Sequence, residues 1–166
     1  LLKSGKELEA DIIVTATGLN LLAFGGIDLS VDGDEVSLPD TVSYKGMMLS
    51  GVPNFLFAIG YTNSSWTLKV DLVCEYMCRL IDFVDRTGRD VATPEVQDPD
   101  MELRPILDFK AGYVMRSIDE LPKQGTEAPW FLTMNYQRDA KYLRDCPVDD
   151  AIRFSSKARE REAAAV

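Results

Sequence analysis

Residues 55–88 read FLFAIGYTNSSWTLKVDLVCEYMCRLIDFVDRTG, the pattern of a buried strand that leads into a long helix. The apolar run at 55–59 ends at Gly60 and is typical of a parallel strand covered on both faces. Four residues with N-cap side chains follow at 62–65, and after them the apolar spacing becomes helical. Gly88 supplies a left-handed C-cap. The sequence predicts an α/β fold with a helix over residues 64–86.

Apolar residues occupy two rows of this helix. The first row is Leu68, Leu72, Tyr76 and Leu80, and the second is Val70, Cys74, Met77 and Ile81. Only a narrow polar stripe remains, on which Glu75 and Arg79 are spaced as an i,i+4 pair. We therefore expect the helix to be covered on most sides, with Leu72 in the core beside the 55–59 strand.

The flanking segments predict smaller elements. Residues 11–16 (DIIVTA) form a second apolar run that suits a buried strand, closed by Thr17-Gly18. Asp32-Gly33 separates two alternating segments and predicts a β-hairpin, and residues 44–49 predict a short strand. Residues 89–105, which contain three prolines, predict an irregular surface connector.

The C-terminal region is expected to be rich in helix. Residues 111–121 predict a short helix closed by Pro122, and Asn135 could cap a second helix that stops at Pro147. Residues 155–166 show no apolar periodicity and are expected to fray.

Composition excludes several classes of function. The chain has 166 residues, 18 Lys+Arg against 27 Asp+Glu, a formal net charge of −9 and a pI of about 4.5. It therefore offers no basic field for nucleic acid or anionic membrane. No histidine is present, which removes imidazole-based triads, HExxH metalloproteases and histidine-ligated metals. No apolar run approaches the length of a membrane span.

The cysteines argue for a reducing compartment. Cys74, Cys78 and Cys146 are odd in number and none belongs to a CxxC pair, so we expect a cytosolic protein without disulfides. Cys74 and Cys78 lie one helical turn apart and could hold a metal. With no further soft ligand nearby, buried small hydrophobic residues are the favoured interpretation.

One turn has the character of a binding site. In FAIGYTNSSWTLKVDL a strand, a glycine and a capped helix follow one another, so unpaired N–H groups and the helix dipole face outwards. An ordinary strand-to-helix turn is the simpler interpretation, because no GxGxxG or GxxxxGK[ST] loop occurs in the chain. Tyr44, Tyr61 and Trp66 could stack on a flat ring, although packing is the commoner role. The acidic pairs Asp119-Glu120 and Asp149-Asp150 are expected to be solvated surface.

Several blocks, in order, resemble one family. DIIVTATGLN resembles the ATG strand of the two-dinucleotide-domain flavoprotein monooxygenases, which include flavin-containing and Baeyer-Villiger monooxygenases. YKGMMLSGVPNFLFAIGYTNSSWTLKVDLVCEYMCRLI resembles the last strand and helix of their FAD domain, and GYVMRSIDELPKQG with PWFLTMNYQRD extends the likeness. Both family GxGxxG loops and the FxGxxxHxxx(W/F)P fingerprint are missing. The resemblance implies the C-terminal portion of an enzyme roughly threefold larger.

The resemblance also implies a division of the chain and a set of site residues. Residues 1–88 would be the C-terminal part of the FAD-binding domain, and residues 89–166 a connector and C-terminal extension. Thr17 and Gly18 match the ATG corner that passes close to the cofactors. The turn that faces the flavin's pyrimidine edge matches Tyr61, Thr62, Asn63, Ser64 and Ser65. Trp66 would line the substrate side of the ring.

The implied reaction is cofactor chemistry. NADPH would reduce FAD, and a flavin C4a-(hydro)peroxide formed with O₂ would oxygenate a ketone, sulfide or amine. This chain alone, without the phosphate loop, is expected to bind neither cofactor appreciably and to be inactive. Its partner would be the missing N-terminal region, whose absence exposes apolar surface and favours self-association. A flavin reductase or dehydrogenase of the same architecture, and a cofactor-free α/β interaction domain, are the alternatives.

Overall fold

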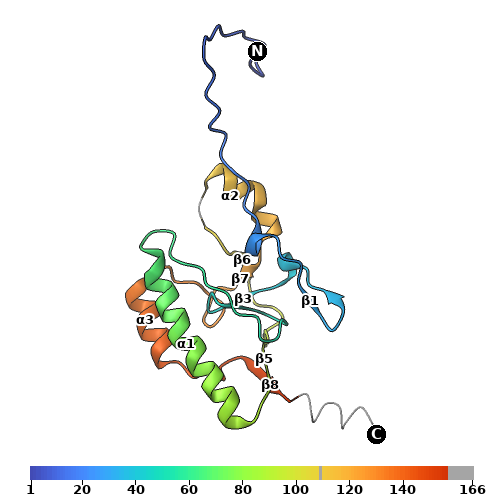
Figure 1. The fold of residues 1–166 in the computed structure, drawn as a ribbon, viewed down its shortest axis with the longest axis vertical. Helices are drawn as coiled ribbons and strands as arrows, with labels where there is room; N and C mark the ends of the chain where they lie inside the picture. Colours follow the sequence, from blue (N-terminus) through green and yellow to red (C-terminus); the bar gives the residue numbers. More distant parts are fainter. Residues whose placement is uncertain (109, 157–166) are drawn as a thin grey trace.

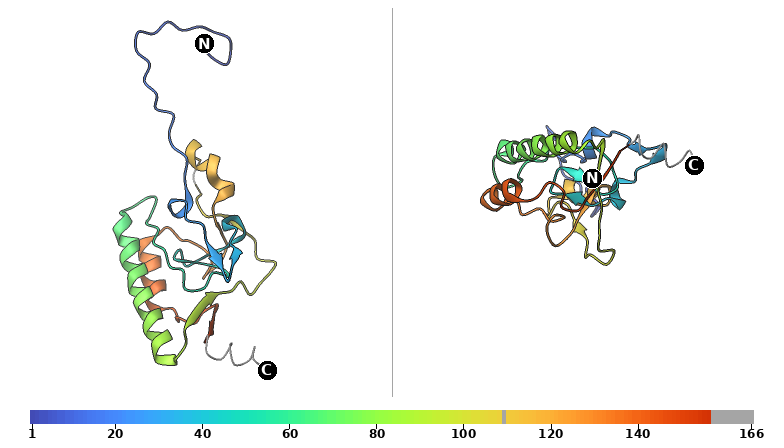
Figure 2. Two further views of the ribbon diagram at one scale, coloured as in Figure 1. Left: turned by 45° about the vertical axis from the view of Figure 1, so that its right-hand side comes forward. Right: turned by 90° about the horizontal axis from the view of Figure 1, so that it is seen from below.

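Two helices flank a group of short strands. The structure is a computed structural model that describes residues 1–108 and 110–156. Helices α1 (Trp66–Thr87) and α3 (Tyr136–Asp145) lie side by side along one flank of the strands (Figures 1 and 2). Residues 1–20 run away from this body as extended, exposed chain, close to α2 (Gly112–Ser117) only at their end (Figure 1).

Helix α1 confirms the strongest prediction from the sequence. It begins after Ser65 and ends at Gly88, which adopts a left-handed conformation at φ 63° and donates its N–H to Val84 and Asp85. Glycine takes this conformation without a Cβ clash, which explains the stop. The buried side of α1 carries Leu72, Val73, Tyr76 and Leu80.

The expected coverage of α1 on most sides is wrong. Of the second apolar row, Cys74 is exposed and Ile81 keeps 53% of its surface. The favoured interpretation of Cys74 and Cys78 as buried hydrophobic residues is also wrong, because both are exposed. Helix α3 and the strands cover one side of α1 and leave the other to solvent.

The strands are short and antiparallel. Among the described residues they pair two by two, in four small sheets. These are β1 (Ser30–Val31) with β2 (Asp34–Glu35), β3 (Ser43–Tyr44) with β4 (Met48–Leu49), β5 (Val91–Pro94) with β8 (Ile152–Ser155), and β6 (Arg104–Pro105) with β7 (Lys123–Gln124). Short 3₁₀ turns lie at Ala23–Gly25, Leu38–Asp40 and Ile118–Glu120.

The hairpin at Asp32-Gly33 is confirmed, while the single strand predicted at 44–49 is a second hairpin. Its turn contains Lys45 at φ 50° and Gly46 at φ 71°. A Cβ on Gly46 would lie 2.5 Å from Leu132 Cδ2, so both the backbone conformation and the space require glycine there. The connector at 89–105 is more ordered than predicted, because residues 91–94 pair with β8.

Neither of the two predicted buried strands forms. Ile12, Ile13 and Val14 are 80–84% exposed, and residues 55–59 carry no strand although Phe57 is buried. A parallel strand is held by hydrogen bonds from neighbouring strands. Among the described residues no strand pairs with either run, although the Phe57 N–H donates to Met47 O at 2.9 Å, so apolar sequence alone does not produce a strand here.

The C-terminal helices agree with the predictions. Helix α2 and the 3₁₀ turn after it occupy 112–120, within the expected 111–121. Asn135 caps α3, its side-chain oxygen accepting the N–H of Arg138 at 3.0 Å. The fraying expected at 155–166 falls almost wholly on residues 157–166, outside the described part of the chain.

The main core lies between α1, α3 and the β3–β4 hairpin. Its completely buried members include Tyr44, Met47, Met48, Leu72 and Tyr76. Here Leu72 contributes a side chain that is 1% exposed, and its predicted core position is confirmed. The expected Glu75–Arg79 pair is wrong, because Glu75 pairs with Arg144 of α3 at 2.7 Å. Arg79 donates instead to the backbone oxygen of Leu143.

Substitution Leu72→Ala is expected to lower the free energy of unfolding by about 2–5 kcal/mol, because a cavity remains in a packed core. The measurement is urea denaturation followed by circular dichroism. Leu68→Ala, on the same face but 37% exposed, is the matched control and should have a much smaller effect. Equal losses for the two variants would contradict the core position of Leu72.

Candidate functional site

An apolar cavity of about 840 Å³ lies at the N-terminal end of α1. Three segments line it: residues 21–24, residues 58–66, and the region from Ile106 to Pro122. Most of the wall is aliphatic or aromatic, and the polar edge comes from Tyr61, Thr62 and Asn63. An apolar cavity with a few convergent polar groups is typical of a small-molecule site.

The cavity gathers half of the site residues predicted from the sequence. Tyr61, Thr62, Asn63 and Trp66 line it. Ser64 and Ser65 belong to the same turn but do not reach the cavity wall, and both are exposed. Thr17 and Gly18 lie outside the lining as well, so the turn and the ATG corner are separate features of this structure.

The ATG corner is nevertheless attached to the element that forms the far wall. Gly18 adopts φ 84°, and a Cβ there would lie 3.5 Å from Arg116 Nη2 and 4.0 Å from Tyr113. Arg116 of α2 donates to the backbone oxygen of Leu19 at 2.9 Å. Since Tyr113 lines the cavity, α2 connects the corner with the site.

The start of α1 has backbone donors without a side-chain cap. Ser65 is the N-cap residue, but its side chain accepts no backbone N–H of the helix; its hydroxyl is paired instead with the Thr67 hydroxyl at 2.9 Å. The first N–H groups of a helix have no partner within the helix, and the macrodipole adds partial positive charge there. This end of a 22-residue helix can therefore stabilise negative charge on a bound group.

Gly60 permits the close approach of the chain to this helix start. A Cβ at residue 60 would overlap the Trp66 ring and lie 2.7 Å from Trp66 Cα. No side chain fits in that space without moving the first turn of α1. Gly60 thus sets the position of the turn that carries Tyr61 to Asn63.

A buried network of charged and polar groups fixes the Tyr61 hydroxyl. The Tyr61 hydroxyl donates to Asp139 Oδ2 at 2.8 Å, and Lys69 Nζ donates to the same oxygen at 2.8 Å. Thr133 donates to Oδ1 at 2.5 Å. Tyr61, Lys69 and Asp139 are 3–5% exposed. Burial, and then the bond to Asp139, raises the pKa of Tyr61, so this phenol stays protonated and acts as a donor.

The network was not predicted from the sequence. Lys69 and Asp139 are 70 residues apart, and each fits the polar side of an amphipathic helix. Only the packing of α1 on α3 brings them together. Asn63 is tied to the same segment, its amide donating to the backbone oxygen of Met134 at 3.1 Å.

The other candidates from the sequence are distributed as follows. Asp119, Glu120 and Asp149 are exposed as expected, but Asp150 is half-buried and faces Lys45 at 3.7 Å. Tyr44 is completely buried and does not line the cavity.

Within residues 1–108 and 110–156, no cluster of three or more Cys, Asp or Glu residues is placed to hold a metal ion. No helix in the described part of the chain is both long and apolar enough to span a membrane.

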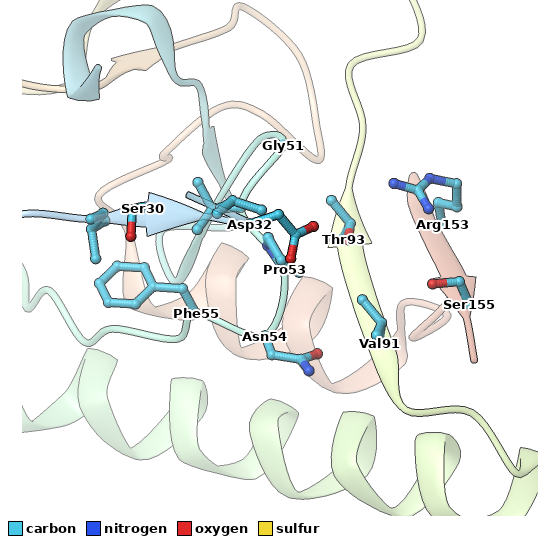
Figure 3. A pocket seen from close by; sticks show the side chains of 13 residues that line it. Ser30, Asp32, Gly51, Pro53, Asn54, Phe55, Val91, Thr93, Arg153 and Ser155 are labelled. Carbon is cyan, nitrogen blue, oxygen red and sulfur yellow. The ribbon is translucent and has the colours of Figure 1, made fainter. Parts of the chain in front are cut away.

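A larger groove of about 940 Å³ lies elsewhere on the molecule. It runs between the β1–β2 hairpin, the turn at 51–55 and the β5–β8 pair, with Asp32 and Thr93 facing it (Figure 3). Arg153 at its edge is paired with Glu95. None of the site residues predicted from the sequence borders this groove, so the cavity at α1 is the candidate site.

Comparison with known proteins finds relatives over nearly the whole chain. The chain is 52% identical over 157 residues to the FAD-containing monooxygenase EthA of Mycobacterium tuberculosis. It is therefore related to the FAD-containing monooxygenases. EthA of Mycolicibacterium smegmatis is 48% identical over 158 residues, and MymA of Mycobacterium tuberculosis is 46% identical over 166 residues.

The match is nearly complete for this chain but partial for its relatives. It covers 94% of the chain and 32% of the Mycobacterium tuberculosis EthA, so the chain spans about a third of the length of the curated relatives it matches. For MymA the shares are 99% and 34%. No family profile matches the chain, and no solved structure is significantly similar to it.

Proposed function

We propose that this chain is the C-terminal third of an FAD- and NADPH-dependent monooxygenase that oxygenates a ketone, sulfide or amine. The observation that carries the proposal is the cavity at the start of α1, in a chain 52% identical to an FAD-containing monooxygenase. Residues 1–88 would complete the FAD-binding domain, and residues 89–166 would form a connector and extension.

The residues present fit the ring end of a flavin. The aliphatic and aromatic wall suits a flat ring system, and the start of α1 offers N–H groups without a side-chain cap. Thr62, Asn63, Ser64 and Ser65 would hold the polar edge of the ring through backbone donors. When bound, FAD supplies the transfer of electrons from NADPH to O₂. A glycine-rich loop for the pyrophosphate is not in this sequence and would come from the rest of the protein.

The chain's own contribution is positioning, charge stabilisation and exclusion of water. The dipole of α1 would favour negative charge on the ring edge. Tyr61 is held rigid by Asp139, which fixes the turn beside it. Trp66, 54% exposed in this structure, would form the substrate side of the cavity together with Leu22 and Phe24. An apolar wall keeps water away from the reacting atoms.

The partner of this chain would be the N-terminal region of the same protein. Ile12, Ile13 and Val14 form an apolar run that is at least 80% exposed and has the composition of a parallel strand. We propose that it joins a sheet of that region, and that Thr17 and Gly18 then reach the cofactors. A cytosolic location would follow from the reduced cysteines.

The test uses the full-length flavoprotein that contains this chain and compares Ser64→Pro with Ser64→Ala. Ser64 lies one residue before the N-cap Ser65, so proline there removes one backbone N–H of the turn that leads into α1, whereas alanine keeps it. We expect Ser64→Pro to lower the flavin midpoint potential by about 10–20 mV, equivalent to a dipole contribution of about 0.5–1 kcal/mol. Ser64→Ala should leave the potential unchanged.

Equal potentials in both variants would contradict the placement of the flavin at this helix. Product analysis with a ketone, a sulfide and an amine tests the reaction itself. Oxidation of NADPH without transfer of oxygen to any of the three would favour the reductase alternative.

A further inference from the structure

Lys45 is a buried cation outside the candidate site. It lies in the β3–β4 turn, and its side chain is 0% exposed. The rings of Tyr44, Tyr76 and Tyr142 surround Nζ, with centroids at 4.9, 4.7 and 5.4 Å. Its nearest carboxylate, Asp150, is 3.7 Å away. Nζ also donates to the Tyr76 hydroxyl at 3.2 Å and to the backbone oxygen of Pro147 at 3.4 Å. These neutral acceptors and the aromatic faces replace only part of the hydration of an ammonium ion.

Cys146 supplies a thiol in contact with that amine. Lys45 Nζ lies 3.3 Å from Cys146 Sγ, within contact distance, although the two residues are 101 positions apart in the chain. Cys146 is the residue after α3 and is 8% exposed, in contrast to Cys74 and Cys78. Two backbone bonds fix the pair: Lys45 N–H to Pro129 O at 2.8 Å and Cys146 N–H to Tyr142 O at 2.9 Å.

The surroundings favour a nucleophilic amine. Burial lowers the pKa of Lys45, and the nearby Cys146 and Asp150 only partly oppose this shift. A neutral amine carries a lone pair that can attack an oxidised sulfur, whereas an ammonium ion cannot. Sulfenic acids are known to condense with neighbouring nitrogen atoms in proteins.

We propose that Lys45 and Cys146 are a modification site, at which oxidation joins Nζ to Sγ in a reversible covalent cross-link. Hydrogen peroxide is the oxidant: it converts the Cys146 thiol to a sulfenic acid and is itself reduced to water. The Lys45 amine then attacks the sulfur, the S–O bond breaks, and hydroxide leaves with a proton from nitrogen as a second water. A further equivalent of peroxide inserts one oxygen between sulfur and nitrogen and leaves as water. A dithiol reductant returns both groups to their starting state: one equivalent, oxidised to its disulfide, cleaves the S–N bond, and the oxygen-bridged form consumes two equivalents and releases its oxygen as water.

The cross-link would tie the C-terminal end of α3 to the β3–β4 turn. Residues of both elements contribute to the main core, and the same helix carries Asp139 of the candidate site. Oxidation would thus restrict the movement of α3, which carries Asp139, without using any residue that lines the cavity.

The experiment isolates Cys146 as the single thiol. In the Cys74→Ser/Cys78→Ser protein, both substitutions fall on exposed positions. The protein is treated with hydrogen peroxide, and its intact mass is measured by mass spectrometry before and after addition of dithiothreitol. We expect a loss of two hydrogens, or that loss with a gain of one oxygen, reversed by the reductant. Proteolysis of the folded, oxidised protein should release one joined peptide that contains both Lys45 and Cys146.

Two variants complete the test. Lys45→Arg keeps the positive charge but not the amine, and Cys146→Ser removes the sulfur; neither should give the joined peptide. In Lys45→Arg, Cys146 should instead gain whole oxygen atoms. The proposal is overturned if the parent protein gains only whole oxygen atoms, or if its mass does not change. The presence or absence of the joined peptide in the parent protein tests the proposal even where a variant folds poorly.

Discussion

Substitution Asp139→Ala is expected to lower the free energy of unfolding by about 3–5 kcal/mol, one of the largest effects of any single change in this protein. The carboxylate accepts three hydrogen bonds, from Tyr61, Lys69 and Thr133, and is 3% exposed. Its removal leaves the Lys69 ammonium buried without a counter-charge. Urea denaturation of the purified variant gives the value.

Two controls separate the buried charge from general damage. Glu75→Ala breaks the exposed pair with Arg144, joined across the same two helices, and should change stability little. The double variant Lys69→Met/Asp139→Leu removes both buried charges and should recover most of the loss. If Asp139→Ala were no worse than Glu75→Ala, the Lys69–Asp139 pair would not be buried as the structure places it.

A steep loss of stability above about pH 10 is the second large expected effect. Burial raises the pKa of Tyr44, Tyr61, Tyr76 and Tyr142, each well above the ordinary tyrosine value of 10.0. Each phenol then ionises in the unfolded chain before it does so in the folded one. The stability that it contributes is complete below pH 10 and is lost as the pH rises towards the folded value, at about 1.4 kcal/mol per pH unit and group.

Lys45 acts in the opposite direction over a lower range. Its pKa is lowered from 10.5, so the unfolded chain binds the extra proton and stability rises with pH up to about 10.5. Above that value the four buried tyrosines lower the stability as the pH rises. The midpoint temperature of thermal unfolding, measured between pH 8 and 12, should therefore fall steeply at the upper end of that range.

Tyr142→Phe provides the specific check of this explanation. The Tyr142 hydroxyl is buried without a hydrogen-bond partner in the described structure, so its loss should be tolerated at neutral pH and should make the alkaline decline shallower. Tyr136→Phe, at a position 38% exposed, is the control. Identical pH profiles for these two variants would contradict the role of burial.

Local signals predicted the elements that depend on their own residues. Helix α1 follows from N-cap side chains, helical apolar spacing and Gly88, and α3 follows from Asn135. The hairpin at Asp32-Gly33 follows from its turn residues. Each of these signals acts within a few positions of the chain, so the element it predicts does not depend on the tertiary contacts of the segment. The turn at 61–66 was likewise predicted from its residues and lines the cavity, except for Ser64 and Ser65.

Features that need distant partners were decided by tertiary structure alone. The apolar runs at 11–16 and 55–59 do not form strands, because a strand exists only through bonds to a neighbour. Pairing of β5 with β8 joins residues about sixty positions apart, and it gives order to a segment whose prolines predicted an irregular connector. Lys45, Lys69 and Asp139 belong to residue types that are mostly exposed in proteins. They are buried because α1, α3 and the β3–β4 turn enclose them with oppositely charged, aromatic or sulfur-containing partners, and only the folded chain brings those partners within bonding distance.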